Sequence, residues 1–149
     1  MPSFTTKRRV GHPASDMFDL VADIEHYPEF VPLCRSIKVG QRRTVGEGIE
    51  TLRSEMTVAY KMISETFVTR VTLDKPRLQI HVQYLDGPFR QLENRWTFRP
   101  LGEHASEVEF FISYEFRSRT LGFLMGSMFD TAFRRFAEAF ERRADVVFA

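Results

Sequence analysis

The chain has 149 residues, with 21 Lys and Arg against 20 Asp and Glu, which gives a formal net charge of +1. This length fits one domain over residues 1–149, which buries about two-thirds of the surface that its unfolded form exposes. The balanced charge argues against a global electrostatic attraction to DNA or to anionic membranes. The single cysteine, Cys34, excludes an internal disulfide framework and a multi-cysteine zinc site, and cytoplasm is the default compartment.

The apolar residues are numerous but dispersed. No run approaches the roughly 18 apolar residues that span a bilayer, and the first residues lack the apolar segment of a signal peptide. We therefore expect a soluble or peripheral protein. The unusual feature is 15 Phe beside six Met, for which two interpretations are open. These residues form either an aromatic core or a cavity lined by flat, adaptable side chains.

The N-terminal residues predict a strand followed by a helix. The strand covers residues 3–10 and ends at Gly11. The helix is expected over residues 13–25, because Pro13 suits the first helical position and Asp16 complements the dipole of the first turn. The chain therefore begins with one strand and one short amphipathic helix.

An aromatic turn between two prolines follows this helix. Pro28 and Pro32 each disfavour the helical conformation of the residue before them, so the helix should end near His26. We call residues 27–33 the proline turn. Such an apolar turn either closes the end of a core or forms the rim of a lipid-sized pocket. Its apolar side chains are Tyr27, Phe30, Val31 and Leu33.

The middle of the chain, from Ser36 to Arg117, predicts strands. Apolar and polar residues alternate in runs that are separated by turn residues, which is typical of strands with short connections. Short connections imply a strongly bent antiparallel sheet that is polar on one side. The candidate strands are residues 36–43, 49–62, 65–74, 78–84, 92–98 and 107–117. Residues expected to face inward include Ser54, Met56, Tyr60, Met62, Thr69, Tyr84, Leu92, Asn94, Trp96, Phe98, Tyr114 and Phe116.

The chain ends in a predicted helix over residues 121–147. Apolar side chains recur along one broad stripe, and charged residues lie opposite. Two pairs four residues apart, Asp130 with Arg134 and Glu138 with Arg142, support the helix. Such a helix must pack across the concave face of the sheet, the only large apolar surface available. The stripe comprises Leu121, Met125, Met128, Phe129, Ala132, Phe133, Phe136, Phe140, Ala144 and Val147.

Four segments carry a family resemblance. They are Leu20-Val-Ala-Asp-Ile-Glu-His-Tyr-Pro-Glu-Phe-Val-Pro-Leu-Cys34, Asn94-Arg-Trp-Thr-Phe98, Phe110-Phe-Ile-Ser-Tyr-Glu-Phe116 and Ala139-Phe-Glu-Arg-Arg-Ala144. With the order of elements, they resemble the coenzyme-Q-binding START-domain family of the START and polyketide-cyclase-like superfamily. That family also includes a bacterial ribosome-association toxin. The resemblance does not distinguish the quinone-binding members from this toxin.

The resemblance implies an α+β helix-grip fold of the START/Bet v 1-like kind. A bent antiparallel sheet of about six to seven strands would wrap around the long C-terminal helix, with one or two short helices after the first strand. The cavity between them would hold a polyisoprenoid quinone such as ubiquinone (coenzyme Q), in support of respiratory electron transfer or quinone biosynthesis. The resemblance implies no catalytic residue and no catalytic cofactor.

The ligand-binding candidates are the side chains that we expect to face this cavity. They are Phe30, Val31, Met56, Tyr60, Tyr84, Asn94, Trp96, Phe98, Tyr114, Phe116, Met125, Met128, Phe129, Phe133 and Phe136. Asn94 should point inward, where its amide must find partners. Its partner is either a quinone carbonyl or a neighbouring backbone group, and the sequence leaves both open.

A search for catalytic chemistry favours a protein that is not an enzyme. The four histidines show no metal-ligand spacing, and Cys34 has no nearby catalytic partner in the sequence. Glu25, His26 and Glu29 form an acid-base cluster, but a solvated helix end explains them better. A small cyclase or dehydratase remains a weaker alternative, and it requires an inward acid-base pair that the sequence does not supply.

Two surface features bear on partners. A candidate lip for transient contact with the inner membrane comprises Phe30, Val31, Leu121, Phe123 and Leu124, which would otherwise close the core. Basic runs at residues 7–9, 42–43, 134–135 and 142–143 permit the alternative function, in which they grip the large ribosomal subunit through RNA or bind anionic lipid headgroups. We expect a prenylquinone or another lipid as the main partner, and no DNA.

Overall fold

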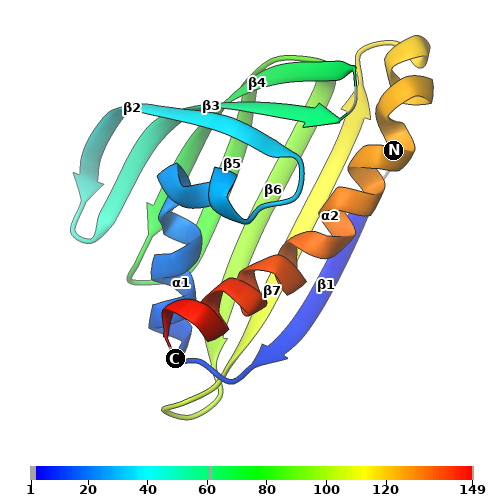
Figure 1. Ribbon diagram of the computed structural model, residues 1–149. Helices are drawn as coiled ribbons and strands as arrows, with labels where there is room; N and C mark the ends of the chain where they lie inside the picture. Colours follow the sequence, from blue (N-terminus) through cyan, green and yellow to red (C-terminus); the bar gives the residue numbers. More distant parts are fainter. Residues whose placement is uncertain (1–2, 61, 149) are drawn as a thin grey trace.

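The computed structural model of the protein describes residues 3–60 and 62–148. Within them, a seven-stranded antiparallel sheet bends around one long helix (Figure 1). In chain order the elements are β1 (Ser3–Val10), α1 (Ala14–Ala22), the 3₁₀ helix η1 (Ile24–Glu29), β2 (Cys34–Gly46), β3 (Ile49–Tyr60), β4 (Ile63–Asp74), β5 (Gln79–Asp86), β6 (Phe89–Pro100), β7 (Ser106–Phe116) and α2 (Arg119–Val147). The predicted α+β helix-grip fold is confirmed.

The strands lie in the order β1-β7-β6-β5-β4-β3-β2, so each neighbours the next in sequence except β1, which pairs with β7. This register aligns the inward positions of neighbouring strands. Val82 on β5 pairs with Asn94 on β6, and Asn94 pairs in turn with Ile112 on β7. Asn94 therefore belongs to a row of inward-facing residues that crosses the sheet.

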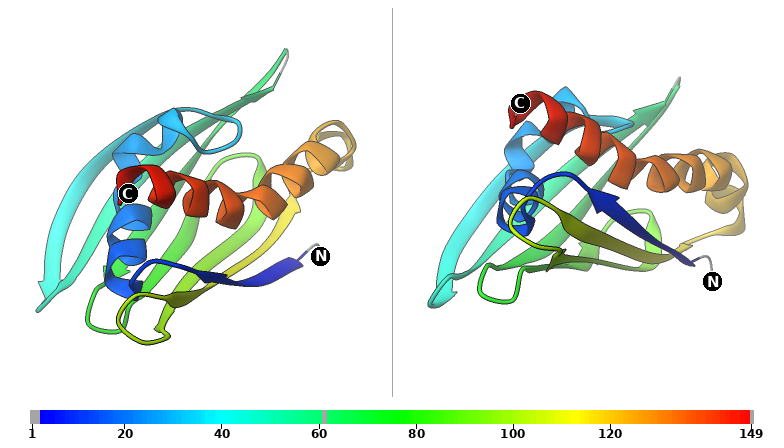
Figure 2. Two further views of the ribbon diagram at one scale, coloured as in Figure 1. Left: turned by 60° about the horizontal axis from the view of Figure 1, so that its bottom comes forward. Right: turned by 90° about the horizontal axis from the view of Figure 1, so that it is seen from below.

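The helix α2 lies across the concave face of the sheet, as both views in Figure 2 show, and its buried side chains belong to the predicted apolar stripe or its edge. The prediction fails at Val147, which is half exposed, whereas the ring of the next residue, Phe148, lies 5.9 Å from the ring of His12. Among the described residues, no helix combines the length and the apolar character needed to cross a membrane. The buried residues of α2 are Met125, Phe129, Ala132, Phe133, Ala137, Phe140 and Ala144.

The predicted helix over residues 13–25 is wrong at its end. The helix α1 stops at Ala22, and the amide of Asp23 donates to the carbonyl of Leu20. A separate 3₁₀ helix then begins, and it includes Pro28, which the sequence had placed outside any helix. The tighter 3₁₀ turn accommodates the proline within a short segment, where a continued α-helix would lose a hydrogen bond.

The predicted inward face of the strand at residues 49–62 ends earlier than expected. Ser54 and Val58 are buried, but Tyr60 is 45% exposed and Met62 is 99% exposed. Figure 2 shows the reason, because the β3–β4 hairpin projects past the rest of the sheet. Position 61 of that predicted strand lies outside the described residues.

Candidate ligand-binding cavity

A cavity of about 80 Å³ lies between the concave face of the sheet and α2. Its walls come from β3 to β7, α2, η1 and the proline turn. The lining is almost wholly apolar, which suits an apolar ligand. It comprises Ile24, Tyr27, Pro32, Leu33, Ser54, Met56, Val58, Phe67, Thr69, Val71, Ile80, Val82, Leu92, Asn94, Trp96, Ile112, Phe129, Ala132, Phe133, Phe136 and Phe140.

Three small polar side chains interrupt this apolar wall. The Asn94 side chain donates from Nδ2 to the backbone carbonyl of Phe111 at 2.8 Å, so its nitrogen has the backbone partner that the sequence left open. Ser54 and Thr69 face each other across β3 and β4, and each is 3% exposed. The sequence placed both facing inward but did not include them among the site residues. The feature of the sequence that could have identified them as site residues is a polar residue within an otherwise apolar inward face.

The structure divides the fifteen ligand-binding candidates into two groups. Those that line the cavity are Met56, Asn94, Trp96, Phe129, Phe133 and Phe136. Those that lie outside its lining are Phe30, Val31, Tyr60, Tyr84, Phe98, Tyr114, Phe116, Met125 and Met128. Periodicity identified the inward face, but the packing between elements decides where that face stays open. Phe98 and Met125, for example, are buried in the core beyond the cavity.

An aromatic cluster around Phe89 fills part of the concave face. The sequence pattern did not predict Phe89 as an inward residue, because Phe89 lies out of step with the inward positions of β6. A register shift between Phe89 and Gln91 turns it inward, where its side chain is fully buried. Its ring centroid lies 4.9 to 5.9 Å from those of Tyr84, Tyr114, Phe116 and Phe129. All four are predicted ligand contacts that pack against this ring, and only Phe129 among them also lines the cavity.

The proline turn packs against the C-terminal half of α2. Val31 is buried, and the rings of Tyr27 and Phe30 meet the ring of Phe140 edge-on at 5.2 and 5.0 Å. The hydroxyl of Tyr27 donates to the carbonyl of Val21, and burial raises the pKa of this phenol, which stays neutral. This turn closes one end of the cavity.

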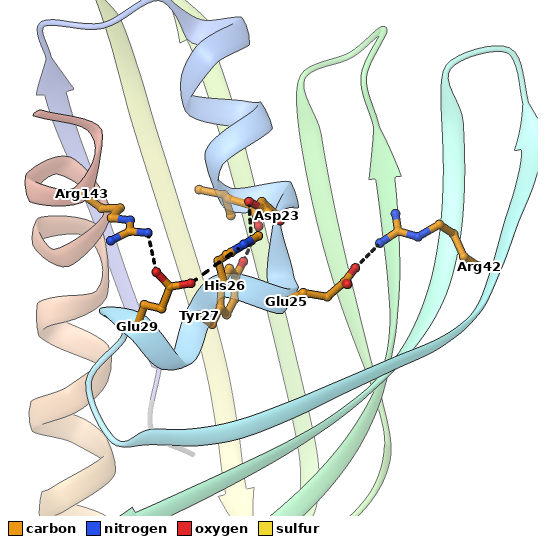
Figure 3. A network of polar contacts seen from close by, with 8 residues as sticks. Asp23, Glu25, His26, Tyr27, Glu29, Arg42 and Arg143 are labelled. Atoms are coloured by element: carbon orange, nitrogen blue, oxygen red, sulfur yellow. Dashed lines mark hydrogen bonds and ion pairs between the residues drawn. The ribbon is translucent and has the colours of Figure 1, made fainter. Parts of the chain in front are cut away.

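Ion pairs hold the turn in place (Figure 3). Glu29 on η1 bonds Arg143 on α2 at 2.9 Å, which ties the turn to the helix. Glu25 bonds Arg42 on β2 at 3.1 Å. His26 is half exposed, and a hydrogen bond to Asp23, reinforced by the negative charge of that residue, raises the pKa of its imidazole. The acid-base cluster predicted here is thus a surface network outside the cavity lining.

The cavity wall offers little acid-base chemistry. Among the described residues, its lining holds no carboxylate, imidazole, Lys or Arg. Cys34 is also a poor nucleophile, because burial raises the pKa of its thiol to about 11 and keeps it protonated at neutral pH. No group of His, Cys, Asp and Glu within residues 3–60 and 62–148 is arranged to hold a metal ion. Within the described lining, no acid-base pair of the kind that the cyclase alternative predicts faces the cavity.

A surface groove of about 410 Å³ adjoins the cavity, and we call it the mouth groove. It shares Pro32, Leu33 and Ala132 with the cavity wall. Tyr60 and Met128 line the groove and not the cavity. Leu33 has a backbone φ of 66°, in the left-handed region that branched side chains rarely adopt. A strained, bulky residue therefore separates the inner cavity from the groove.

The residues of the predicted membrane lip are not all at the surface. Val31 is in the core, and Phe30 and Leu121 are partly buried. Phe123 is 88% exposed and Leu124 is 54% exposed, so the first turns of α2 present bare apolar side chains to solvent. Exposed apolar side chains on adjacent positions are candidates for contact with a membrane or another protein.

A bent antiparallel sheet, a long helix across it and an apolar cavity between them define a START-like helix-grip protein. The chain belongs to the polyketide cyclase/dehydrase and lipid transport family, whose model matches residues 10–141. The family's description covers both enzymes and lipid carriers.

The chain is similar to named proteins of two different kinds. The ribosome association toxin RatA of Pseudomonas aeruginosa is 33% identical over 133 residues, which covers 89% of this chain and 88% of that protein. The mitochondrial coenzyme Q-binding protein COQ10 of Drosophila melanogaster is 31% identical over 119 residues, which covers 77% of this chain and 47% of that protein. The solution structure of the 18 kDa protein CC1736 from Caulobacter crescentus is 32% identical, with a TM-score of 0.79 over all of both chains.

Proposed function

We infer that the protein binds a hydrophobic ligand, a prenylquinone, between the sheet and α2 without transforming it. The observation that carries this proposal is an apolar cavity whose described lining holds no acid-base pair. The similarity to a coenzyme Q-binding protein supports the choice of ligand. Such a carrier would support respiratory electron transfer or quinone biosynthesis.

The size of the cavity sets a condition on binding. Its volume of about 80 Å³ is roughly half that of the engineered cavity of about 150 Å³ that holds one benzene molecule. A quinone ring with its tail therefore requires α2 to move away from the sheet or the ligand to extend through the mouth groove. We expect ligand binding to widen the space beside Leu33 and Ala132, because these two residues line both the cavity and the mouth groove.

Selectivity must come from polar contacts and shape. A quinone resides in a bilayer about as apolar as the cavity, so transfer into the protein gains little from burial alone. We propose that the amide oxygen of Asn94 lies beside the quinone ring while Nδ2 keeps its bond to Phe111. Transient contact with the inner membrane through Phe123 and Leu124 would deliver the ligand.

Extraction of the purified protein tests the ligand. Organic extraction followed by mass spectrometry should recover a prenylquinone, either as purified or after the protein is mixed with quinone-loaded vesicles. Persistent absence of any prenylquinone in both preparations would count against the proposal.

Asn94→Leu tests the polar contact. Loss of the amide should weaken quinone affinity about tenfold, the size expected for one hydrogen bond in an apolar site. Thr69→Val is the matched control, because it removes a hydroxyl from the same wall. Titration with a short-chain quinone, monitored through the fluorescence of Trp96, measures the quinone affinity of both variants. Unchanged affinity in Asn94→Leu would contradict the proposed contact.

Association with the large ribosomal subunit is the second candidate function. It is favoured by relatives named as ribosome association toxins, at 33% identity in Pseudomonas aeruginosa and 32% in Rickettsia prowazekii.

The charges of the predicted basic runs argue against this candidate, because several of their arginines are neutralised by carboxylates. These pairs are Arg8 with Glu141, Arg42 with Glu25, Arg134 with Asp130, Arg142 with Glu138 and Arg143 with Glu29. Co-sedimentation with large subunits at moderate salt separates the candidates, because a quinone carrier should stay in the supernatant.

A further inference from the structure

Arg135 differs from its neighbours on the outer side of α2. It is exposed, and no carboxylate within the described residues pairs with it. The other arginines in this half of the helix are neutralised. Arg134, Arg142 and Arg143 pair with Asp130, Glu138 and Glu29, respectively. Arg135 therefore presents a guanidinium whose positive charge is available to a ligand.

The position of Arg135 connects two grooves on the surface. It lines the mouth groove, which borders the cavity at Pro32, Leu33 and Ala132. It also lines a second groove of about 720 Å³ along the C-terminal half of α2, which we call the helix groove. Ala132 and Arg135 are three residues apart, so they are neighbours on the helix surface. The available charge thus lies about one helical turn from the cavity mouth.

The surroundings of Arg135 favour an anion. Among the described residues that line the helix groove, Glu138 is the one carboxylate, and it is engaged by Arg142; the third arginine there is Arg143. No carboxylate belongs to the lining of the mouth groove within the described residues. A planar guanidinium binds phosphate and carboxylate oxygens through two parallel hydrogen bonds.

We propose that Arg135 binds the phosphate or carboxylate of an anionic single-chain lipid, whose apolar chain enters the cavity through the mouth groove. The proposal rests on the apolar-ligand cavity inferred above and takes an anionic lipid as a second kind of occupant, because a prenylquinone carries neither group and would not engage Arg135. The ligand then lies with its apolar end against Trp96 and its headgroup outside Leu33. A single unpaired arginine suits one headgroup, whereas attraction to an anionic bilayer requires several basic residues together.

A matched pair of ligands tests the charged subsite. Decyl phosphate and 1-decanol carry the same apolar chain and differ in the phosphate. Trp96 is the single tryptophan of the chain and lines the cavity, so its emission reports arrival of the apolar chain. Below micelle-forming concentrations, decyl phosphate should bind at least about tenfold more tightly than decanol, as expected for hydrogen bonds to a charged group.

Two variants locate the effect. Arg135→Gln should abolish the preference for decyl phosphate while leaving decanol affinity unchanged. Arg119→Gln is the matched control, because Arg119 is also an exposed arginine on α2, without an ion pair in the described residues, and lies outside both grooves. Arg119→Gln should keep the full preference. Circular dichroism and thermal unfolding of both variants should match the unmodified protein.

The outcomes separate this proposal from the apolar-ligand function. Equal affinity for both ligands, or a preference that survives in Arg135→Gln, overturns the headgroup subsite and leaves the apolar cavity standing if decanol binds. Binding of neither ligand overturns the headgroup subsite, whereas the prenylquinone proposal is decided separately by the extraction experiment. Inorganic phosphate alone should leave Trp96 emission unchanged; if it displaces decyl phosphate at equal concentration, the site holds free anions and the lipid proposal fails.

Discussion

The two halves of α2 are held against the rest of the molecule by different forces. The C-terminal half forms ion pairs with other elements. These pairs are Glu141 with Arg8 on β1 and Arg143 with Glu29 on η1, and Asp145 also lies within hydrogen-bond distance of His12, at 2.7 Å. From residues 119–133 no ion pair reaches another element within the described residues, and apolar side chains such as Phe129 make the contact.

This difference identifies where a ligand can enter. Ion pairs have directional partners, and separating them exposes charges that need new partners. Apolar contacts are interchangeable, so an apolar ligand chain can replace them with little net change. The cavity mouth at Ala132 lies at the edge of the apolar half. We therefore expect α2 to open from its N-terminal half while its C-terminal half stays attached to the proline turn.

The largest test removes one aromatic anchor from each half. Phe129→Ala and Phe140→Ala each delete a side chain that is 1% exposed, and each should lower the free energy of unfolding by about 3 to 5 kcal/mol. Urea denaturation measures the free energy of unfolding of both variants. Phe129→Ala should also loosen residues 119–133 selectively, because only apolar contacts hold them. Equal loss of amide protection over the whole of α2 would break the comparison.

Hydrogen exchange of the unmodified protein tests the same comparison without mutation. Amides of residues 121–133 should open with a free energy about 1 to 2 kcal/mol below that of residues 134–147, equivalent to exchange about tenfold faster. Mass spectrometry of peptides from each half gives the measurement. Uniform protection would show that both halves open together.

A double-mutant cycle isolates the tether between α2 and the proline turn. Replacing Glu29 and Arg143 with Gln, singly and together, should give a coupling energy of about 0.5 to 1 kcal/mol, because both side chains are partly accessible to solvent. The pair of Glu138 and Arg142 within the helix is the control, with an expected coupling of about 0.3 to 0.5 kcal/mol. Amide hydrogen exchange in the C-terminal half of α2 should become faster when the pair of Glu29 and Arg143 is lost, and not when the pair of Glu138 and Arg142 is lost.

The smallest effect concerns the pH dependence of the same network. A hydrogen bond to Asp23 raises the pKa of His26 above its ordinary value of 6.5 in the folded protein. The charged imidazole therefore stabilises the fold fully below pH 6.5, and this contribution is lost as the pH rises through the raised value. Thermal unfolding should show a gap between unmodified protein and His26→Gln that narrows as the pH rises above 6.5. In an Asp23→Asn background, which lacks the hydrogen-bond partner, the gap should narrow less.

Local pattern predicted much of the fold and only part of the site. Alternation located the strands and the inward position of Asn94, because the direction of a side chain in a strand is a local property. It missed Phe89, whose inward direction depends on a bulge against β7. It also extended the inward face to Tyr60 and Met62, because periodicity does not show where the covering helix ends.

The sequence by itself determined the helix-grip architecture, the apolar face of α2 and the family, because periodicity, turn residues and the segment from Leu20 to Cys34 are all local. Only the tertiary structure decided how much of the concave face stays open, since that depends on the Phe89 cluster and on the proline turn meeting Phe140. It also decided which arginines are neutralised. The partners Arg8 and Glu141 are 133 residues apart, and no local pattern joins them or leaves Arg135 unpaired beside the mouth.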